Sequence, residues 1–216
     1  MAVIPAVLNN KSDEILGGII LRETIIERKT NETDIRVKLN LDGTGKYKND
    51  TKIGFLNHML DLFAKHGRFD MEVICNGDID VDYHHSVEDI GIVIGKCFAD
   101  ILGDARGIKR YGNFYMPMDE ALTLVAIDIC GRAYLKFDVE IPAQKVGSFD
   151  TELIKEFFLG FTRGIEATIH IKTFYGENSH HIIESVFKGF ARAIAQAAEI
   201  DEKFRDEIMS TKGVLA

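Results

Sequence analysis

The chain has 216 residues, and its 26 lysines and arginines against 34 aspartates and glutamates give a formal net charge of −8. It lacks the basic stripe with which nucleic-acid-binding proteins neutralise phosphates. It also lacks an apolar run of about 20 residues, the length that crosses a bilayer. No basic segment of a secretory signal stands at the N-terminus. We therefore expect a cytoplasmic protein without nucleic-acid or membrane partners, in which Cys75, Cys97 and Cys130 are reduced core residues.

The first half of the chain carries patterns of both strands and helices. Short alternating or apolar runs predict strands, and these cover residues 34–42, 69–75 and 79–83. Apolar side chains at helical spacing predict two helices, over residues 57–66 and 86–101. Gly67 is expected to be the C-cap of the first helix and Gly103 to end the second.

The second half repeats this order of elements. Strands are predicted over residues 121–129, 133–139 and 168–174. Helices are predicted over residues 151–163 and 182–198, and the residues from 201 onward form a charged tail.

The pattern His-His-x-x-Glu occurs once in each half, at residues 84–88 and 180–184. Each copy is expected at the start of a helix, and each is preceded by a helix with one further possible ligand, His58 or Glu156. Two such copies at equivalent places are hard to produce by chance. We therefore predict an α+β fold with an internal duplication.

The duplicated pattern favours metal binding. Residues four apart on a helix share one face, so His84 with Glu88, and His180 with Glu184, suit chelation of one ion. His85 and His181 point about 100° away and are free to bind a second ion. Mixed imidazole and carboxylate ligands without thiolate suit manganese, iron, nickel or zinc, and open coordination positions indicate catalysis.

Several basic residues lie where a phosphorylated small molecule would bind. Lys188 is one helical turn after Glu184 and on the same face, so it reaches a ligand held at the metal. Lys109 and Arg110 stand shortly after Gly107, Arg132 directly follows Gly131, and Ser210 and Lys212 stand near the C-terminus. In an acidic chain, such residues beside a metal centre suggest a phosphorylated substrate.

With these residues in hand, the sequence closely resembles the imidazoleglycerol-phosphate dehydratase family. The matching stretches are RKTNET at 28–33, NHML at 57–60, DYHHSVED at 82–89, MDEA at 118–121, GR at 131–132, TEL at 151–153, GENSHH at 176–181 and FK at 187–188. The resemblance implies two similar halves, each a four-stranded sheet with two helices on one face. One dehydratase domain would then comprise an N-terminal extension, two α+β halves and a C-terminal tail, at residues 1–20, 21–105, 106–200 and 201–216.

The resemblance also implies the site residues by matching position. The metal ligands would be His58, His84, His85, Glu88, Glu156, His180, His181 and Glu184, holding two Mn²⁺ per subunit; many members carry a histidine where this chain has Glu156. Substrate would be bound by Glu32, His58, His84, His85, Glu88, Arg110, Arg132, His180, Lys188, Ser210 and Lys212. The catalytic residues would be Glu32, Glu184 and His84. The family forms homo-oligomeric shells of 24 subunits with active sites between subunits, so one chain need not supply every group.

The implied reaction is the loss of water from imidazoleglycerol phosphate to give imidazole-acetol phosphate, a step of histidine biosynthesis. No carbonyl group stands next to the carbon that must lose its proton, so that proton is not acidic. This gives a reason for two metal ions. An imidazole bridging two cations becomes an imidazolate, which expels the neighbouring hydroxyl group and forms a diazafulvene-like intermediate. We assign to Glu32 the proton shuttle of the following tautomerisation.

Two other classes of protein compete with this interpretation: another metalloenzyme, such as a dinuclear hydrolase or a di-iron carboxylate protein, and a metal-storing or shell-forming protein without activity. Di-iron carboxylate bundles use Glu-x-x-His on four long helices, and zinc proteases use His-Glu-x-x-His, and neither arrangement fits this chain. A metal-storing protein that keeps the fold without activity has no need of Glu32, Arg110, Arg132 and Lys188 beside the ligands.

Overall fold

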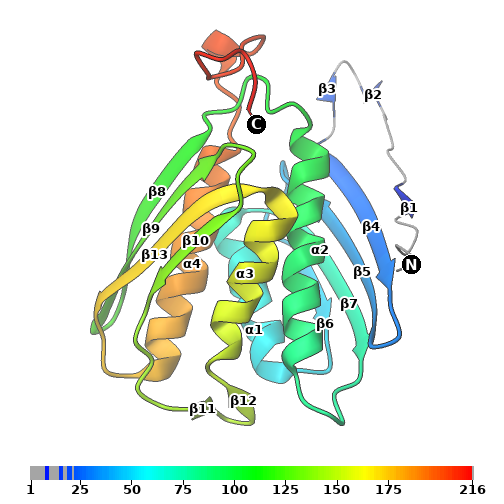
Figure 1. The fold of residues 1–216 in the computed structure, drawn as a ribbon. Coiled ribbons are helices and arrows are strands. Elements are labelled where there is room, and N and C mark those ends of the chain that lie inside the picture. The colour runs from blue at the N-terminus through cyan, green and yellow to red at the C-terminus, as the bar shows by residue number, and fades with distance from the viewer. Residues whose placement is uncertain (1–7, 10–14, 17–18, 21, 216) are drawn as a thin grey trace.

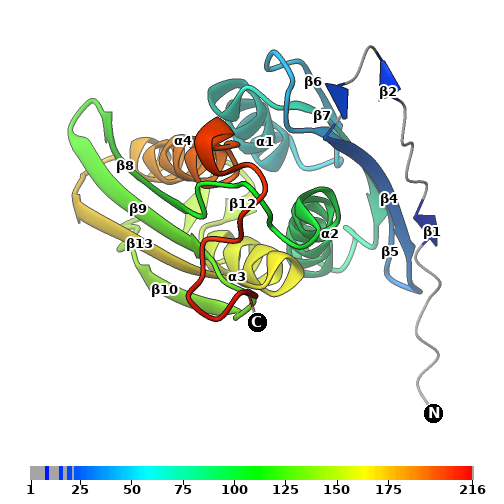
Figure 2. The same ribbon diagram turned by 90° about the horizontal axis from the view of Figure 1, so that it is seen from above.

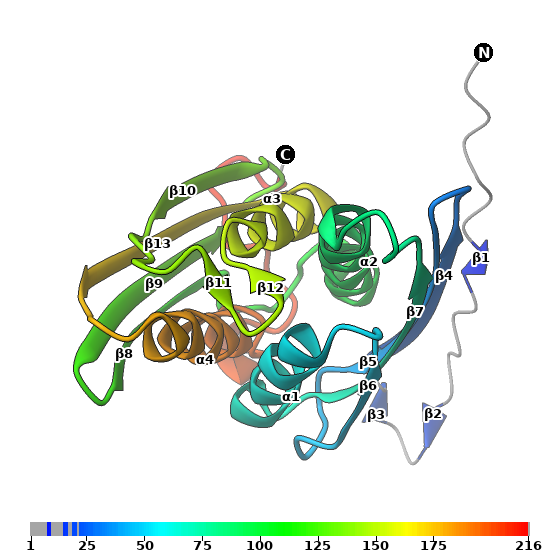
Figure 3. The same ribbon diagram turned by 90° about the horizontal axis from the view of Figure 1, so that it is seen from below.

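Two β-sheets form the outer layers of the molecule, and the helices lie between them (Figures 2 and 3). The computed structural model describes residues 8–9, 15–16, 19–20 and 22–215. The expected N-terminal extension, residues 1–20, lies largely outside this part of the chain. Within it no helix is long and apolar enough to cross a membrane.

The first half builds one sheet and two helices (Figure 1). Its elements are β4 (Glu23–Lys29), β5 (Thr33–Asn40), β6 (Tyr47–Asp50), α1 (Gly54–Gly67), β7 (Asp70–Gly77) and α2 (His84–Leu102). The strand order is β4-β5-β7-β6, and the short β1 (Leu8–Asn9) pairs with the outer side of β4. The two-residue strands β2 (Ile15–Leu16) and β3 (Ile19–Ile20) pair with each other in a separate two-stranded sheet.

The second half repeats this construction. Its elements are β8 (Tyr111–Met118), β9 (Ala121–Ile129), β10 (Tyr134–Asp138), α3 (Leu153–Ile165), β13 (Ala167–Tyr175) and α4 (Ser179–Ala197). A small hairpin of β11 (Lys145–Val146) and β12 (Phe149–Asp150) precedes α3, and a 3-10 helix (Glu202–Phe204) follows α4.

Apart from β1, which adds a fifth strand to the first sheet, the two sheets have the same topology. The second sheet has the order β8-β9-β13-β10, which matches β4-β5-β7-β6 strand for strand. In both, the first two pairings are antiparallel and the last is parallel. The predicted α+β duplication, with two helices covering one face of each sheet, is therefore confirmed.

Strands with clear alternation were predicted well, whereas several other strands were missed. β5 and β9 alternate buried and more exposed residues along their length. The strands β4, β6 and β8 and the β11–β12 hairpin were not predicted. Both β6 and β8 lie at sheet edges, where most of their side chains are exposed, whereas the edge strand β10 was predicted because its residues alternate. β8 even contains Pro117, which an edge strand tolerates because it need not donate every ladder hydrogen bond.

Two local predictions were wrong. Residues 79–83 form a turn instead of a strand: the N–H of Val81 donates to the carbonyl of Asp78 at 2.9 Å, and Val81 is 72% exposed. The left-handed residue that ends α1 is Arg68, with φ 61°, and not Gly67. Gly67 is the last helical residue and makes room for Phe69, whose ring would lie 2.2 Å from a Cβ at that position.

The helices of the two halves pack directly against each other, and one hydrophobic core runs through both halves. Where α1 meets α4, Phe63 stacks on Phe190 with ring centroids 5.6 Å apart. Phe161 of α3 also packs edge-on against Phe190 at 4.8 Å. Cys75, Cys97 and Cys130 are buried and unpaired, as expected.

Glycines bring α2 and α3 into backbone contact. A Cβ on Gly160 would lie 2.4 Å from the carbonyl oxygen of Glu88, and one on Gly164 would lie 2.4 Å from that of Ile92. Because both contacts advance by one turn in the same direction, the helices are parallel (Figure 1). One helical turn closer to the N-termini, the same pairing of positions places His84 of α2 level with Glu156 of α3.

Candidate metal centre and substrate-binding residues

The two His-His pairs stand at the N-terminal ends of α2 and α4, as the sequence predicted. Asn178 caps α4, because its side-chain oxygen accepts the N–H groups of His180 at 2.9 Å and His181 at 3.4 Å. Before α2, the side chain of Asp82 accepts the N–H of His84 at 2.7 Å. These bonds fix where each helix begins and so the direction in which its histidines point.

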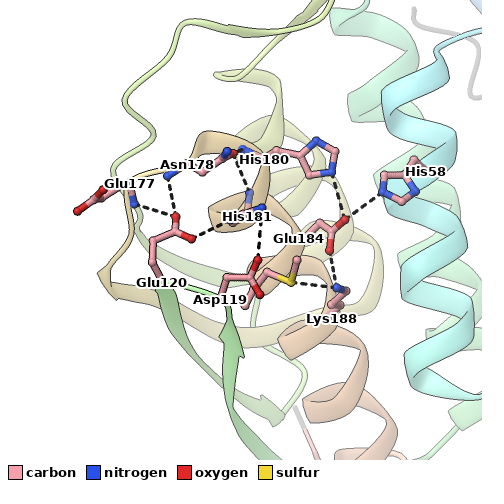
Figure 4. Close-up of polar contacts among 10 residues, drawn as sticks. His58, Asp119, Glu120, Glu177, Asn178, His180, His181, Glu184 and Lys188 are labelled. Carbon is pink, nitrogen blue, oxygen red and sulfur yellow. Dashed lines mark hydrogen bonds and ion pairs between the residues drawn. The ribbon is translucent and has the colours of Figure 1, made fainter.

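His58, His180 and Glu184 form a cluster between α1 and α4 (Figure 4). The Nε2 atoms of both histidines lie 3.1 Å from Oε1 of Glu184. Possible ligand atoms of the three residues all lie within 4.8 Å of one another. Since α1 belongs to the first half and α4 to the second, the packing of the two halves creates this cluster. Its donors, two imidazoles and a carboxylate, fit a divalent transition metal.

Lys188 completes the cluster on the side of Glu184. Its Nζ forms an ion pair with Oε2 of Glu184 and lies 3.3 Å from the sulfur of Met118. Burial raises the pKa of Glu184, but hydrogen bonds from Lys188, His58 and His180 outweigh it and lower that pKa to about 2. Glu184 is therefore ionised and available as an oxygen ligand at neutral pH.

The corresponding residues of the first half are more exposed to solvent and lie farther apart. Nε2 of His84 lies 3.9 Å from Oε2 of Glu88, so the two share one face of α2 as predicted. Glu88 also forms an ion pair with Arg163 of α3. Glu156 lies in the first turn of α3 and is half-buried. Among the described residues, His58, His180 and Glu184 are the only group of three whose ligand atoms meet.

The second histidine of each pair turns away from the first and towards carboxylates. Nδ1 of His85 is 2.9 Å from Asp78, and its Nε2 is 3.9 Å from Glu32. Nδ1 of His181 is 2.7 Å from Glu120. The hydrogen bond that His85 donates to Asp78 raises the pKa of His85, and the one that His181 donates to Glu120 raises the pKa of His181.

The expected phosphate-binding residues lie at the opposite end of the helices, with the exception of Lys188. The N–H of Arg110 donates to the carbonyl of Ala197, the last residue of α4. The Arg110 side chain bonds Asp128 at 2.7 Å and the carbonyl of Met209 at 2.6 Å, which places Ser210 beside it. Arg132 follows β9 near the same end, and Lys212 lies in the tail. Because α4 has 19 residues, the two groups are separated by roughly 27 Å within one chain.

Three carboxylates around the histidines were not singled out from the sequence. Asp78 and Glu120 contact the Nδ1 atoms, and Asp119 lies 3.8 Å from Nε2 of His181. Asp119 and Glu120 belong to the MDEA stretch, to which the sequence alone assigned no role. Asp78 follows β7, and no local pattern distinguishes it from the other acidic residues of that loop.

Comparisons with known proteins identify the family of this chain. The family model described as imidazoleglycerol-phosphate dehydratase matches residues 51–194. The imidazoleglycerol-phosphate dehydratase of Clostridium kluyveri is 57% identical over 190 residues, which cover 88% of this chain and 97% of that protein. The enzyme of Geobacter sulfurreducens is 52% identical over 194 residues, covering 90% and 99%.

Solved structures of the same enzyme have the same fold. The imidazoleglycerol-phosphate dehydratase of Staphylococcus aureus superposes with a TM-score of 0.74 at 40% identity, over 82% of this chain and 99% of that one. The Pyrococcus furiosus enzyme, in complex with (S)-C348, has a TM-score of 0.76 at 41% identity, over 88% and 99%. This chain therefore belongs to the imidazoleglycerol-phosphate dehydratase family, hydro-lyases of histidine biosynthesis.

Proposed function

We propose that this protein removes water from imidazoleglycerol phosphate to give imidazole-acetol phosphate with the help of two Mn²⁺ per chain. The observation that carries the proposal is the cluster of His58, His180 and Glu184, whose ligand atoms lie within 4.8 Å of one another. Imidazole nitrogens and an ionised carboxylate are a donor set that manganese accepts. The family membership supplies the reaction, and the cluster supplies a reason for its metal dependence.

The proposed ligands divide between two ions according to the direction of the histidines. His58, His180 and Glu184 face one point, and His84 with Glu88 faces another, level with Glu156. The side chains of His85 and His181 point away from these two groups, and these histidines are the remaining two of the eight proposed metal ligands. When bound, the ions supply Lewis acidity that favours an imidazolate form of the substrate, from which loss of hydroxide gives the diazafulvene-like intermediate.

The acid–base step is assigned to Glu32, with His84 and Glu184 as the other catalytic residues. Glu32 stands in the turn between β4 and β5, its side chain is 55% exposed, and it lies 3.9 Å from Nε2 of His85. It is thus both accessible to a substrate and adjacent to a proposed ligand. A carboxylate in this position is able to move a proton between substrate carbon atoms during the tautomerisation.

The substrate is proposed to bind between subunits. Lys188 is close enough to the cluster to contact a substrate there, and its charge attracts a phosphate. Arg110, Arg132, Ser210 and Lys212 lie at the far end of α4, about 27 Å away by its length. A three-carbon phosphate ester cannot span that gap, so a neighbouring chain must supply these residues. This favours the 24-subunit homo-oligomer.

Three buried unpaired thiols favour a cytoplasmic location.

The first experiment is turnover of imidazoleglycerol phosphate by protein stripped with a chelator and then titrated with Mn²⁺. We expect activity to appear with the metal and to saturate near two ions per chain. Tight Mn²⁺ binding without turnover would contradict the proposed reaction, whereas turnover by fully stripped protein would contradict the proposed metal dependence.

The intersubunit site is tested by mixing two inactive variants. Arg110→Ala and His180→Ala remove groups from opposite ends of α4, so each homogeneous protein should be inactive. If the two are unfolded and refolded together, about a quarter of the sites should draw an intact residue from each chain and regain activity. Mixed oligomers that stay inactive would contradict a site shared between chains, provided that each variant alone still assembles.

A further inference from the structure

We infer that Glu120 is a positioning residue, which holds His181 with Nδ1 protonated and leaves Nε2 free to bind manganese. The inference rests on the proposed function, because it concerns one of the proposed ligands. Glu120 stands in the turn between β8 and β9, and its side chain reaches across to the start of α4 (Figure 4).

Three donors converge on the Glu120 carboxylate. Its Oε1 accepts the backbone N–H of Asn178 at 2.7 Å and that of Glu177 at 3.1 Å. Its Oε2 lies 2.7 Å from Nδ1 of His181. The two backbone bonds fix the plane of the carboxylate, so the oxygen that faces the imidazole is always the same one. Glu120 thereby joins the β8–β9 turn, the loop before α4 and the histidine into one unit.

This geometry decides which ring nitrogen carries the proton. An ionised carboxylate only accepts hydrogen bonds, so a histidine Nδ1 at this distance must donate. The lone pair of the neutral ring is then on Nε2, which points away from Glu120 and lies 3.8 Å from the nearest Asp119 oxygen, beyond hydrogen-bond distance. A carboxylate behind a histidine is a recurrent way to orient a metal ligand and to increase its basicity.

The first half contains the same contact from a different place in the fold. Nδ1 of His85 lies 2.9 Å from Asp78, which follows β7. The residue that corresponds to Glu120 in the first half is Glu32, since each immediately precedes the second strand of its sheet. The two halves therefore support their second histidines with carboxylates from non-equivalent positions. A contact that reappears with the accepting carboxylate at a different position is better explained by a need for it than by inheritance from the duplication.

The substitution Glu120→Gln separates positioning from structural support. The glutamine carbonyl still accepts the two backbone N–H groups, which forces its NH₂ towards Nδ1 of His181. The imidazole must then accept at Nδ1 and carry its proton on Nε2, the wrong nitrogen for metal binding. We expect one of the two Mn²⁺ ions to bind about 10–100-fold more weakly. The melting temperature of the metal-free protein should stay near the wild-type value.

Compared with Glu120→Gln, Glu120→Ala should lower the melting temperature more and the Mn²⁺ affinity less. It leaves two backbone N–H groups without their partner, so the metal-free protein should melt about 2–4 °C lower. The unsupported imidazole exchanges between its two neutral forms, one of which leaves Nε2 free. Manganese binding should therefore be weakened less than in Glu120→Gln. Glu177→Gln, which removes a neighbouring exposed charge that points away from His181, is the matched control for charge and should match the wild type in both measurements.

The experiment measures Mn²⁺ affinity and stoichiometry by calorimetry, and melting of the chelated protein by circular dichroism, for the intact oligomer of each variant. Wild-type affinity for both ions in Glu120→Gln would overturn the inference, as would a loss of affinity that is equal in the Gln and Ala variants. If the wild-type protein itself binds no Mn²⁺, the proposed metal dependence fails and the inference fails with it. Wild-type binding together with an unaffected Gln variant refutes the inference alone.

Discussion

The crossing of α2 and α3 makes Gly160→Ala a severe test of the packing. A Cβ at this position would lie 2.4 Å from the carbonyl oxygen of Glu88 and 3.1 Å from the backbone nitrogen of Ile92. Both neighbours are backbone atoms inside a helix, so no side-chain rotation can relieve the contact. The helices would have to separate by roughly 1 Å, since non-bonded heavy atoms need about 3.5 Å.

The expected loss of stability follows from two opposing effects. Overpacking of a tight interior costs about 1–3 kcal/mol, and contacts with rigid backbone belong at the upper end, about 3 kcal/mol. Alanine gains about 1 kcal/mol over glycine in helix propensity. The free energy of unfolding should therefore fall by about 2 kcal/mol, which lowers the melting temperature by about 4–8 °C for a chain of this size.

The assay is thermal and urea unfolding of the metal-free protein. Gly54→Ala is the matched control, because Gly54 is also helical but a Cβ added to it would have nothing within 4 Å. We expect that variant to be as stable as the wild type or slightly more so. If Gly160→Ala also melts at or above the wild-type temperature, the helices are not held at the distance that the structure shows.

Three further substitutions test the site and the fold. Glu32→Gln should reduce turnover about 10²–10⁴-fold with unchanged Mn²⁺ content measured by calorimetry, and surviving activity would remove Glu32 from the proton transfer. Lys188→Met should raise the KM for the phosphorylated substrate by about 10–100-fold, the worth of one hydrogen bond to a charged group, and an unchanged KM would argue against substrate binding by this lysine. Burial raises the pKa of Asp70, but bonds from the N–H groups of residues 44 and 46 outweigh it, so the pKa is lowered from 3.8. A lowered folded-state pKa stabilises the fold above pH 3.8, and this contribution is lost as the pH falls through the folded-state value. Asp70→Ala should therefore cost about 1–2 kcal/mol at pH 7, and urea unfolding should show this difference shrinking below pH 3.8; a constant difference would contradict the assignment.

Much of the fold could be predicted because its central elements are regular along the chain. β5 and β9 alternate strictly, and α2 places buried residues at helical spacing, since one face of each must meet the core. The edge strands β6 and β8 escaped prediction because they bury few of their side chains, and β4 was missed as well. The edge strand β10 was predicted because its residues alternate. Alternation alone also misled, since residues 79–83 alternate but form a turn, and none of the described strands pairs with them.

The same distinction applies to the site. The spacing His-x-x-x-Glu by itself determined that His180 shares a helix face with Glu184, because the α-helix fixes the geometry of residues four apart. Only the tertiary structure decided that His58 joins them, that Glu120 and Asp78 stand behind His181 and His85, and that Arg110 lies at the far end of α4. These contacts join elements far apart in the sequence. They depend on how sheets and helices pack, and no local pattern of residues contains that information.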